Sequence, residues 1–418
     1  MFLRFAVPFM LLSAAATAGL AGDWPQILGP HRDGVAQDET LLTNWPEPGP
    51  ATLWSYDVGE GYAGAAVVAD RAIVFHRVGD IERVEALAVE DGRSLWKADF
   101  EASYGGGINS DLGPRCVPVI HGQFVLVYGA GGDVHCVKLA TGEKVWSRQL
   151  HTDFQAPDGY FGAGSTPIAW QNSLLVNVGA RQAGIVALAI DTGKTLWQAT
   201  DDRASYSSPT AWKHGDRVDV VFVTRLHAVG LAPRTGEELF RSPFGASGPT
   251  VNAATPVIVD DHLFLTASYG IGARWVKLGE TPKPVWMDSK DSILSSQYTT
   301  PVYHDGYFYG IHGREDYAGA QLRCIHAENG SVKWTQEDFG VAHLILADKK
   351  LLIAKVDGDL LLAEPNPEKF QTLDHARVAV GTTRAIPALA NGRLFVRVSG
   401  QDAKLVCLQV GKIRDADR

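Results

Sequence analysis

The chain repeats one short phrase, a Thr-Gly turn followed by a strand that ends in tryptophan. Its clearest copy is Leu139-Ala-Thr-Gly-Glu-Lys-Val-Trp146. Other copies end at Trp96, Trp197, Phe240 and Trp334, and a degraded copy ends at Trp286. The mean step from Trp96 to Trp334 is about 48 residues, which lies within the roughly 40 to 50 residues typical of propeller blades. The repeat therefore predicts a ring of similar β-sheets.

A second signal opens each period. A small or hydroxyl residue and then a proline precede an apolar strand, as in Ser207-Ser-Pro209. Proline is tolerated at the first residue of a strand, where its missing N–H costs least. A short turn and an alternating strand such as Gln123–Tyr128 follow. Eight such first strands begin near Ala65, Arg115, Thr166, Ser208, Thr255, Thr300, His343 and Arg384.

These signals predict an all-β fold, an eight-bladed β-propeller of four-stranded antiparallel blades. Seven blades is the alternative, because the unit from Ala342 to Thr372 is short and irregular and has Phe370 in place of the tryptophan. The segment Leu53–Asp57 resembles the tryptophan-bearing strand of a blade, yet no blade precedes it. We expect this N-terminal strand to complete the last blade, which removes an open sheet edge that would otherwise promote aggregation.

The N-terminal region is expected to be a targeting signal followed by a leader. Residues 1–21 combine Arg4, a short apolar run and small residues before Gly22, as in a cleavable secretory signal. No cysteine follows that site, and no later apolar run reaches transmembrane length. We therefore expect a periplasmic or secreted protein with a signal peptide over residues 1–21, a leader over residues 22–50 and a single propeller domain over residues 51–418.

The repeated tryptophans are expected at the rim of the ring. Blades splay apart as they radiate, so the rim needs the largest apolar side chain, and an indole N–H can still reach a neighbouring carbonyl. Cys136, Cys324 and Cys407 occur in the register where other repeats have alanine or glycine. We expect these cysteines to be small buried side chains rather than disulfides or metal ligands.

The charge pattern argues against two classes of partner. The formal net charge is −9, and no block of lysine or arginine interrupts the sequence. Nucleic acid and anionic membrane surfaces attract proteins through concentrated positive charge. Neither is therefore expected to bind this chain.

The phrase Ala-x-Thr-Gly-x-x-x-Trp, repeated around eight blades after a signal peptide, resembles the pyrroloquinoline quinone (PQQ) repeat family. That family includes quinoprotein alcohol dehydrogenases and the periplasmic propeller BamB of the outer-membrane assembly machinery. The leader Trp24–Gly34 is similar to that of secreted planctomycete-type proteins described as PQQ-binding-like. The resemblance covers nearly all of the mature chain. It implies the propeller fold, and it leaves both a PQQ-dependent activity and a non-catalytic role open.

The chain departs from the dehydrogenase members of that family. The resemblance would imply calcium held by carboxylates and amides, an aspartate base and often two adjacent cysteines. Here no two cysteines are adjacent, no Asp or Glu cluster has calcium-loop spacing, and no Cys-x-x-Cys-His motif is present. We therefore expect no metal site and no catalytic residues, and PQQ is kept only as an alternative cofactor.

Long connections between blades, such as Phe100–Pro114 and Leu150–Ser165, make one face of the predicted ring rich in loops. Binding sites on rigid scaffolds favour such loops, so the site is expected at the mouth of the central channel. Guanidinium, phenol, amide and imidazole groups just before the first strands suit an anionic or polyhydroxylated ligand. The candidate ligand-binding residues are Asn109, Arg115, Tyr206, Asn252, Tyr298, His343 and Arg384.

The leading hypothesis is an exported, non-catalytic propeller, monomeric, that binds a protein partner or a small polar or anionic ligand through the loop-rich face. The alternative is an oxidoreductase that depends on PQQ or another cofactor, with Arg115, His343 or Arg384 around the channel. A third class is a hydrolase or lyase acting on polysaccharide. It would need paired carboxylates at glycosidase separation in the channel.

Overall fold

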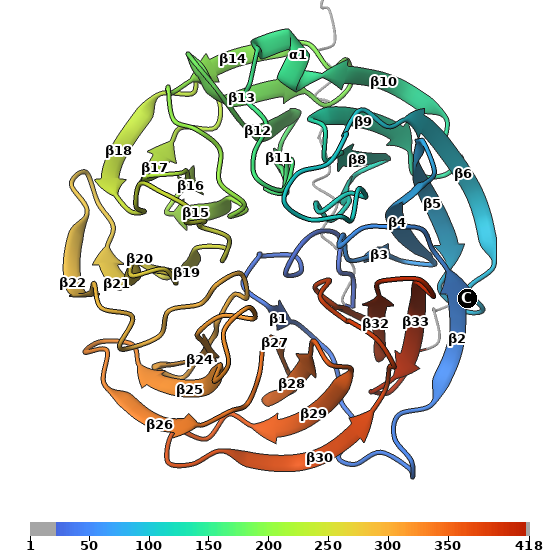
Figure 1. The fold of residues 1–418 in the computed structure, drawn as a ribbon, viewed down its shortest axis with the longest axis vertical. Helices are drawn as coiled ribbons and strands as arrows, with labels where there is room; N and C mark the ends of the chain where they lie inside the picture. The colour runs from blue at the N-terminus through green and yellow to red at the C-terminus, as the bar shows by residue number, and fades with distance from the viewer. Residues whose placement is uncertain (1–21, 415–418) are drawn as a thin grey trace, which may run out of the picture.

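The computed structural model describes residues 22–414, so the predicted signal over residues 1–21 lies outside the described part of the chain. Eight antiparallel sheets are arranged in a ring around one axis (Figure 1). This confirms the eight-bladed, all-β propeller and excludes the seven-bladed alternative. Within residues 22–414, one short helix, α1 (Leu150–Phe154), interrupts the strands. Among the described residues, no helix has the length and apolar character needed to cross a membrane.

Each blade runs from an inner strand at the axis to an outer strand at the rim. Blade 1 comprises β3 (Ala66–Val68), β4 (Arg71–Val78), β5 (Ile81–Ala88) and β6 (Ser94–Glu101). Blade 2 comprises β7 (Val119–His121), β8 (Phe124–Tyr128), β9 (Asp133–Lys138) and β10 (Lys144–Gln149). Blade 3 comprises β11 (Ile168–Trp170), β12 (Ser173–Ala180), β13 (Ala183–Ala189) and β14 (Thr195–Ala199). Blade 4 comprises β15 (Thr210–His214), β16 (Arg217–Val223), β17 (His227–Leu231) and β18 (Glu238–Pro243).

The second half of the ring continues in the same order. Blade 5 comprises β19 (Val257–Val259), β20 (His262–Ala267), β21 (Gly272–Lys277) and β22 (Lys283–Asp288). Blade 6 comprises β23 (Val302–His304), β24 (Tyr307–His312), β25 (Gln321–His326) and β26 (Val332–Gln336). Blade 7 comprises β27 (Ala342–Ala347), β28 (Lys350–Lys355), β29 (Asp359–Glu364) and β30 (Gln371–Arg377), joined by β1 (Val35–Ala36). Blade 8 comprises β31 (Ala388–Ala390), β32 (Arg393–Val398), β33 (Lys404–Gln409) and β2 (Thr52–Asp57).

The N-terminal strand β2 closes the ring, as the sequence predicts. It pairs antiparallel with β33, and Trp54 lies opposite Cys407. The last blade thereby gains its fourth strand from the start of the propeller domain. In this way the edge of β33 is paired instead of being left open.

The repeated tryptophans join consecutive blades at the rim. Six indole N–H groups each donate to a backbone carbonyl of the following blade, for example Trp146 to Ile190 at 2.7 Å. The same ring lies against the glycine of the next Thr-Gly turn: a Cβ at Gly193 would stand 2.7 Å from Trp146. That glycine has a φ of +70°, which glycine adopts without steric cost. The tryptophan and the Thr-Gly turn are therefore two halves of one contact between blades.

The register of the third strand explains why three cysteines occur at equivalent positions in their blades. Cys136, Cys324 and Cys407 each lie directly opposite a rim tryptophan, in the position that Ala86 and Ala187 occupy in other blades. A small side chain there leaves room for the indole ring. All four cysteines are buried and free, as expected. Burial raises the pKa of the Cys136, Cys324 and Cys407 thiols to about 12, so they remain protonated.

The leader crosses the centre of the ring (Figure 1). Its backbone pairs with Val67 of β3 and with Ile120 of β7. The Arg32 guanidinium, 1% exposed, donates to the carbonyls of Thr166, Pro167 and Pro209 and thus joins blades 3 and 4. Farther on, β1 runs parallel to β27 of blade 7. The leader is therefore part of the core, a role that its polar, turn-rich sequence did not predict.

The second half of the leader packs on blades 7 and 8. The Leu42 N–H donates to the Val410 carbonyl at 2.9 Å, and the Trp45 N–H donates to the Asp374 carboxylate of β30. Trp24 and Trp45, 1% and 6% exposed, belong to one apolar cluster with Trp54. Two buried tryptophans thus anchor the leader.

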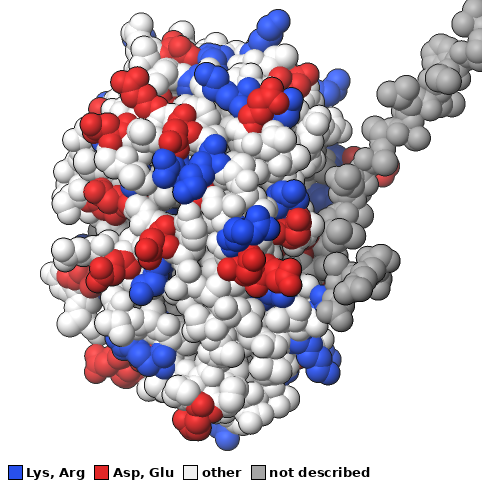
Figure 2. Space-filling model, turned by 90° about the vertical axis from the view of Figure 1, so that its right-hand side faces the viewer, with Lys and Arg blue, Asp and Glu red and all other residues white. Residues whose placement is uncertain are grey.

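The rim carries charges of both signs. On the side of the ring shown in Figure 2, acidic and basic side chains are interspersed. Several form close pairs, such as Arg83 with Asp99 at 2.6 Å and Lys138 with Glu143 at 2.7 Å. Such pairs leave no block of one sign on this side, in keeping with the charge pattern of the sequence.

We expect Gly193→Ala to destabilise the protein more than Gly122→Ala. Both glycines have positive φ, so alanine costs about 1–2 kcal/mol at either site. Only at Gly193 would the new methyl also displace the Trp146 ring, because no heavy atom lies within 4 Å of a Cβ at Gly122. We expect a further cost of about 1–3 kcal/mol. Urea unfolding of both variants measures the difference, and equal midpoints would contradict the rim contact.

We expect Arg32→Met to lower the free energy of unfolding by about 2–5 kcal/mol, because three buried carbonyls lose their donor. Arg234→Met is the matched control, since Arg234 is exposed in a rim turn. It should stay within about 0.5 kcal/mol of the wild type. Chemical denaturation checks both variants. If Arg32→Met left the free energy of unfolding unchanged, the leader would not be holding the ring together.

Candidate functional site

The mouth of the central channel holds a cavity of about 220 Å³, which we call the mouth cavity. Residues before or within the inner strands line it, and Ile27 of the leader forms part of the same wall. Six of the seven candidate residues lie there together: Asn109, Arg115, Tyr206, Tyr298, His343 and Arg384. The structure thus brings together residues up to 275 positions apart in the printed sequence. Their role in binding a ligand stays a prediction.

Arg115 is held by its own loop. Its guanidinium donates to the carbonyls of Gly113 and Asp111, and its Nη1 lies 3.6 Å from the Asp111 carboxylate. The guanidinium also lies over the Tyr104 ring, 5.1 Å from the centroid. Arg115 therefore contributes positive charge to the mouth cavity, while two of its nitrogens are already occupied by the protein.

Arg384 forms a charged cluster with two neighbours. Its Nη2 lies 2.8 Å from Oε2 of Glu315, and the Tyr298 hydroxyl donates to that same oxygen at 2.8 Å. The guanidinium also lies over the ring of Tyr298, 5.1 Å from its centroid. Burial raises the pKa of Tyr298 well above its ordinary value, with the charge of Glu315 adding to the effect. The phenol therefore stays neutral and acts as a hydrogen-bond donor.

His343 lies at the inner wall between blades 7 and 8. It is 5% exposed, and its Nε2–H donates to the Arg384 carbonyl at 2.9 Å. Burial lowers its pKa to about 4. The imidazole is therefore neutral near pH 7, and its bond ties two blades together.

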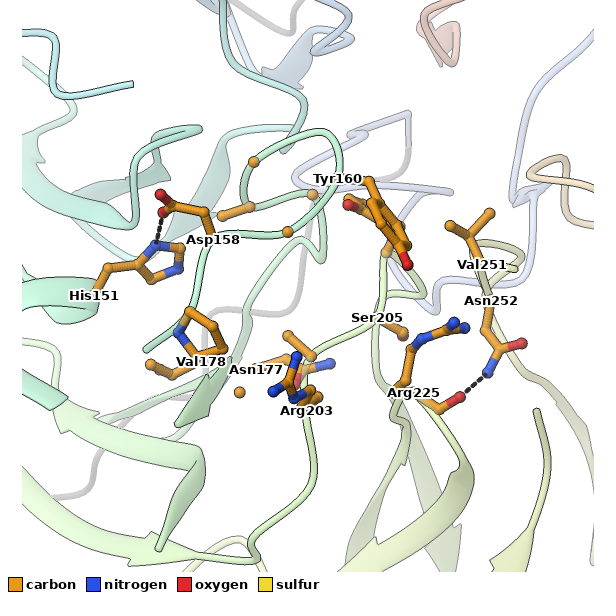
Figure 3. A pocket seen from close by; sticks show the side chains of 18 of the residues that line it. His151, Asp158, Tyr160, Asn177, Val178, Arg203, Ser205, Arg225, Val251 and Asn252 are labelled. Carbon is orange, nitrogen blue, oxygen red and sulfur yellow. Dashed lines mark hydrogen bonds and ion pairs between the residues drawn. The ribbon is translucent and has the colours of Figure 1, made fainter. Parts of the chain in front are cut away.

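Asn252 lies outside the mouth cavity. It is fully buried, and its Nδ2 donates to the carbonyls of Thr224 and Arg225. It lines a second cavity of about 170 Å³ above blades 3 and 4, which we call the interblade pocket (Figure 3). The two cavities share Gly164, Tyr206 and Val251 as a common wall. The sequence thus predicted one site where the structure has two adjacent ones.

Several residues in or beside the mouth cavity were not among the candidates predicted from the sequence. Tyr62 precedes the inner strand β3, so the rule used for the other blades could have found it. Tyr269 lies in the loop after β20, and Glu315 lies in the loop after β24. The only sequence signal for Glu315 is a charged Arg-Glu-Asp run in a loop on the predicted binding face.

The residues of the mouth cavity do not fit a calcium-bound quinone. Calcium is held by several oxygen ligands, usually with carboxylates among them. The lining includes the amides of Asn109 and Gln297 but no Asp or Glu, and the nearby Glu315 already accepts from Tyr298 and pairs with Arg384. Within residues 22–414, no group of three or more His, Cys, Asp or Glu side chains is placed to hold a metal ion.

Comparison with known proteins identifies the family. A family model described as outer membrane protein assembly factor BamB matches residues 35–211 and 80–336, which together exceed half of the chain. The chain belongs to this family. The expected resemblance to PQQ-repeat propellers is thereby confirmed, whereas the resemblance of the leader to planctomycete-type proteins stays a prediction.

Members of the BamB family and the quinoproteins both resemble the chain. Over 185 residues it is 30% identical to the outer membrane protein assembly factor BamB of Burkholderia pseudomallei (strain K96243), covering 42% of each protein. Over 218 residues it is 26% identical to the quinohemoprotein alcohol dehydrogenase ADH-IIG of Pseudomonas putida, covering 45% of the chain and 29% of that enzyme. The matches thus span less than half the length of either relative.

A solved structure with the same architecture is a europium-containing methanol dehydrogenase. It superposes with a TM-score of 0.71 at 12% identity and covers 92% of this chain and 90% of that one. At such low identity the likeness shows the fold alone.

We expect the stability of the folded protein to fall as the pH drops from about 6.5 to about 4, in part through His343. In that window the unfolded chain takes up a proton that the buried imidazole does not, so each such histidine costs up to about 1.4 kcal/mol per pH unit. His343→Gln keeps a donor for the Arg384 carbonyl and should therefore show a shallower loss. Urea midpoints at pH 7 and pH 4.5 compare the two proteins. Equal losses would show that His343 is protonated in the folded state.

Proposed function

We propose that this chain is an exported, non-catalytic binding module that uses the loop-rich face of its propeller. Its partner is a protein or a small polar or anionic ligand, and its location is the periplasm or the cell exterior. Membership of the BamB family supports a scaffold role. The match to the Burkholderia protein covers only part of each chain, so the partner itself is not carried over.

The observation that carries the proposal is that the charged groups of the mouth cavity are already occupied by the protein. Arg115 bonds to its own loop, and Arg384 pairs with Glu315. A general acid or base works best with a pKa near the working pH. The pKa of His343, at about 4, lies far below that range. The site thus offers a rigid, aromatic and polar surface that suits binding better than proton transfer.

The second candidate is an oxidoreductase that depends on PQQ or another cofactor. It is favoured by the two guanidinium groups of Arg115 and Arg384 in one cavity, and by the partial match to the Pseudomonas alcohol dehydrogenase. Guanidinium groups bind carboxylates well, and PQQ carries carboxylates. The missing carboxylate ligands for calcium weigh against it.

One experiment separates the two candidates. We expect purified protein supplied with PQQ and calcium to oxidise neither alcohols nor sugars with an artificial electron acceptor. We also expect no rise in melting temperature, whereas a ligand at about 100 times its dissociation constant would add roughly 2.7 kcal/mol to the stability. If PQQ raises the melting temperature of the wild type, Arg384→Gln tests whether the rise comes from binding in the mouth cavity. Turnover by the wild type that this variant loses would overturn the non-catalytic proposal.

A further inference from the structure

The interblade pocket contains a buried amide without any hydrogen-bond partner. Asn177 of β12 is 3% exposed, and neither its Oδ1 nor its Nδ2 has a partner among the described residues. Its register with β13 is interrupted just after Asn177, which lines the pocket (Figure 3). Because neither atom has a hydrogen-bond partner, exchanging the positions of Oδ1 and Nδ2 would not give the amide a hydrogen bond. An unsatisfied buried amide is costly and calls for a partner.

A second buried amide and two arginines line the same pocket. The Oδ1 of Asn252 is also without a partner, although its Nδ2 is bonded to two carbonyls. Arg225 donates to the Thr250 hydroxyl at 2.7 Å, whereas the Arg203 guanidinium forms no hydrogen bond or ion pair with any described residue. The pocket therefore offers positive charge, one free amide donor and two free amide acceptors.

One acidic residue also lines the pocket. Asp158 lies at its far end, where its carboxylate is 3.5 Å from Nδ1 of His151 (Figure 3). Burial lowers the pKa of His151, so this pair carries about one negative charge near neutral pH. Two arginines against one aspartate leave the pocket positive on balance. An anion is therefore favoured at the end that holds Arg203 and Arg225.

These groups select among anions. Phosphate and sulfate at neutral pH satisfy the arginines but offer few or no donors for the two amide oxygens. A free amino acid brings a positively charged ammonium group, which is disfavoured in a pocket that is positive on balance. A sugar acid satisfies both needs, because its carboxylate accepts from guanidinium groups while each hydroxyl donates and accepts.

The size of the pocket fits one ring. At about 170 Å³ it is smaller than the roughly 300–1,000 Å³ of sites for drug-sized ligands. Tyr160, 44% exposed, lies at the edge of the pocket, where its ring offers a flat apolar surface to the C–H face of a sugar (Figure 3). We propose that the interblade pocket binds a single sugar acid of hexuronate size. This inference rests on the proposed function, because it names a ligand for the same binding face.

The test is calorimetric titration of the full protein with D-glucuronate and D-galacturonate. We expect at least one uronate to bind about tenfold or more tightly than D-glucose, which has the hydroxyls but no carboxylate. Inorganic phosphate should bind more weakly than the uronate. The proposal is overturned if neither uronate binds at millimolar concentration, or if glucose or phosphate binds as well as the better uronate.

Variants of pocket residues test whether the uronate binds in the interblade pocket. Asn177→Leu should lose about tenfold or more in uronate affinity, while its ligand-free melting temperature should stay level or rise because the unsatisfied amide is gone. A structural amide would instead give a lower melting temperature. Arg203→Gln should also weaken binding, and Arg181→Gln, exposed in the adjacent turn, should not. Uronate affinity unchanged in both Asn177→Leu and Arg203→Gln would overturn the assignment to this pocket.

Different measurements separate this inference from the proposed function. The interblade pocket and the mouth cavity share only Gly164, Tyr206 and Val251 as lining residues, so uronate binding and PQQ-dependent oxidation are tested independently. If uronate fails to bind, only the assignment of the pocket is lost. Oxidation in the presence of PQQ would instead overturn the non-catalytic function, whatever the uronate result.

Discussion

The contact of each rim tryptophan with the next Thr-Gly turn determines how the blades of this propeller are joined. The indole donates to a carbonyl beside the turn, and its ring occupies the space that a Cβ would fill at the glycine. At five junctions between blades, the tryptophan of one blade lies against the turn glycine of the next. The same contact therefore recurs around most of the ring. At blade 4, Phe240 replaces the tryptophan, and Trp212 of the inner strand donates instead to Asp260 of blade 5.

The fold could be predicted from the sequence because this contact repeats. The eight first strands follow from the repeated proline signal, and the burial of the cysteines and the closure through β2 follow from the register of the tryptophan phrase. The leader is different, because it occurs once and its partners are distant in sequence. The Arg32 guanidinium reaches Thr166 and Pro209, which are 134 and 177 residues away. No local pattern marks such an arginine as buried.

In the candidate site, too, some features follow from the repeat and others depend on contacts between distant residues. By the rule that residues before the inner strands face the channel, six of the candidate side chains line the mouth cavity, and their role in binding stays a prediction. Asn252 does not line that cavity, because its amide turns toward the backbone of blade 4. The rule does not apply to Asn177, because this residue lies inside the apolar strand β12 and not before an inner strand. Nothing in the sequence distinguishes it from an ordinary strand residue. Its significance comes from missing hydrogen bonds, which only three-dimensional contacts reveal.

Closure of the ring by β2 also has a consequence for the order of folding. Trp54 must meet Cys407, and the Glu39 carboxylate must meet the backbone of Gly392, 353 residues later in the chain. Folding dominated by such distant pairings is slow, and the entropy of closing the loop is lost before the contacts form. During synthesis the first blade has no completed neighbour on its blade 8 side until the final strands emerge. A chain that stops short of β33 leaves both β2 and the edge of blade 8 unpaired, and such edges are prone to aggregation.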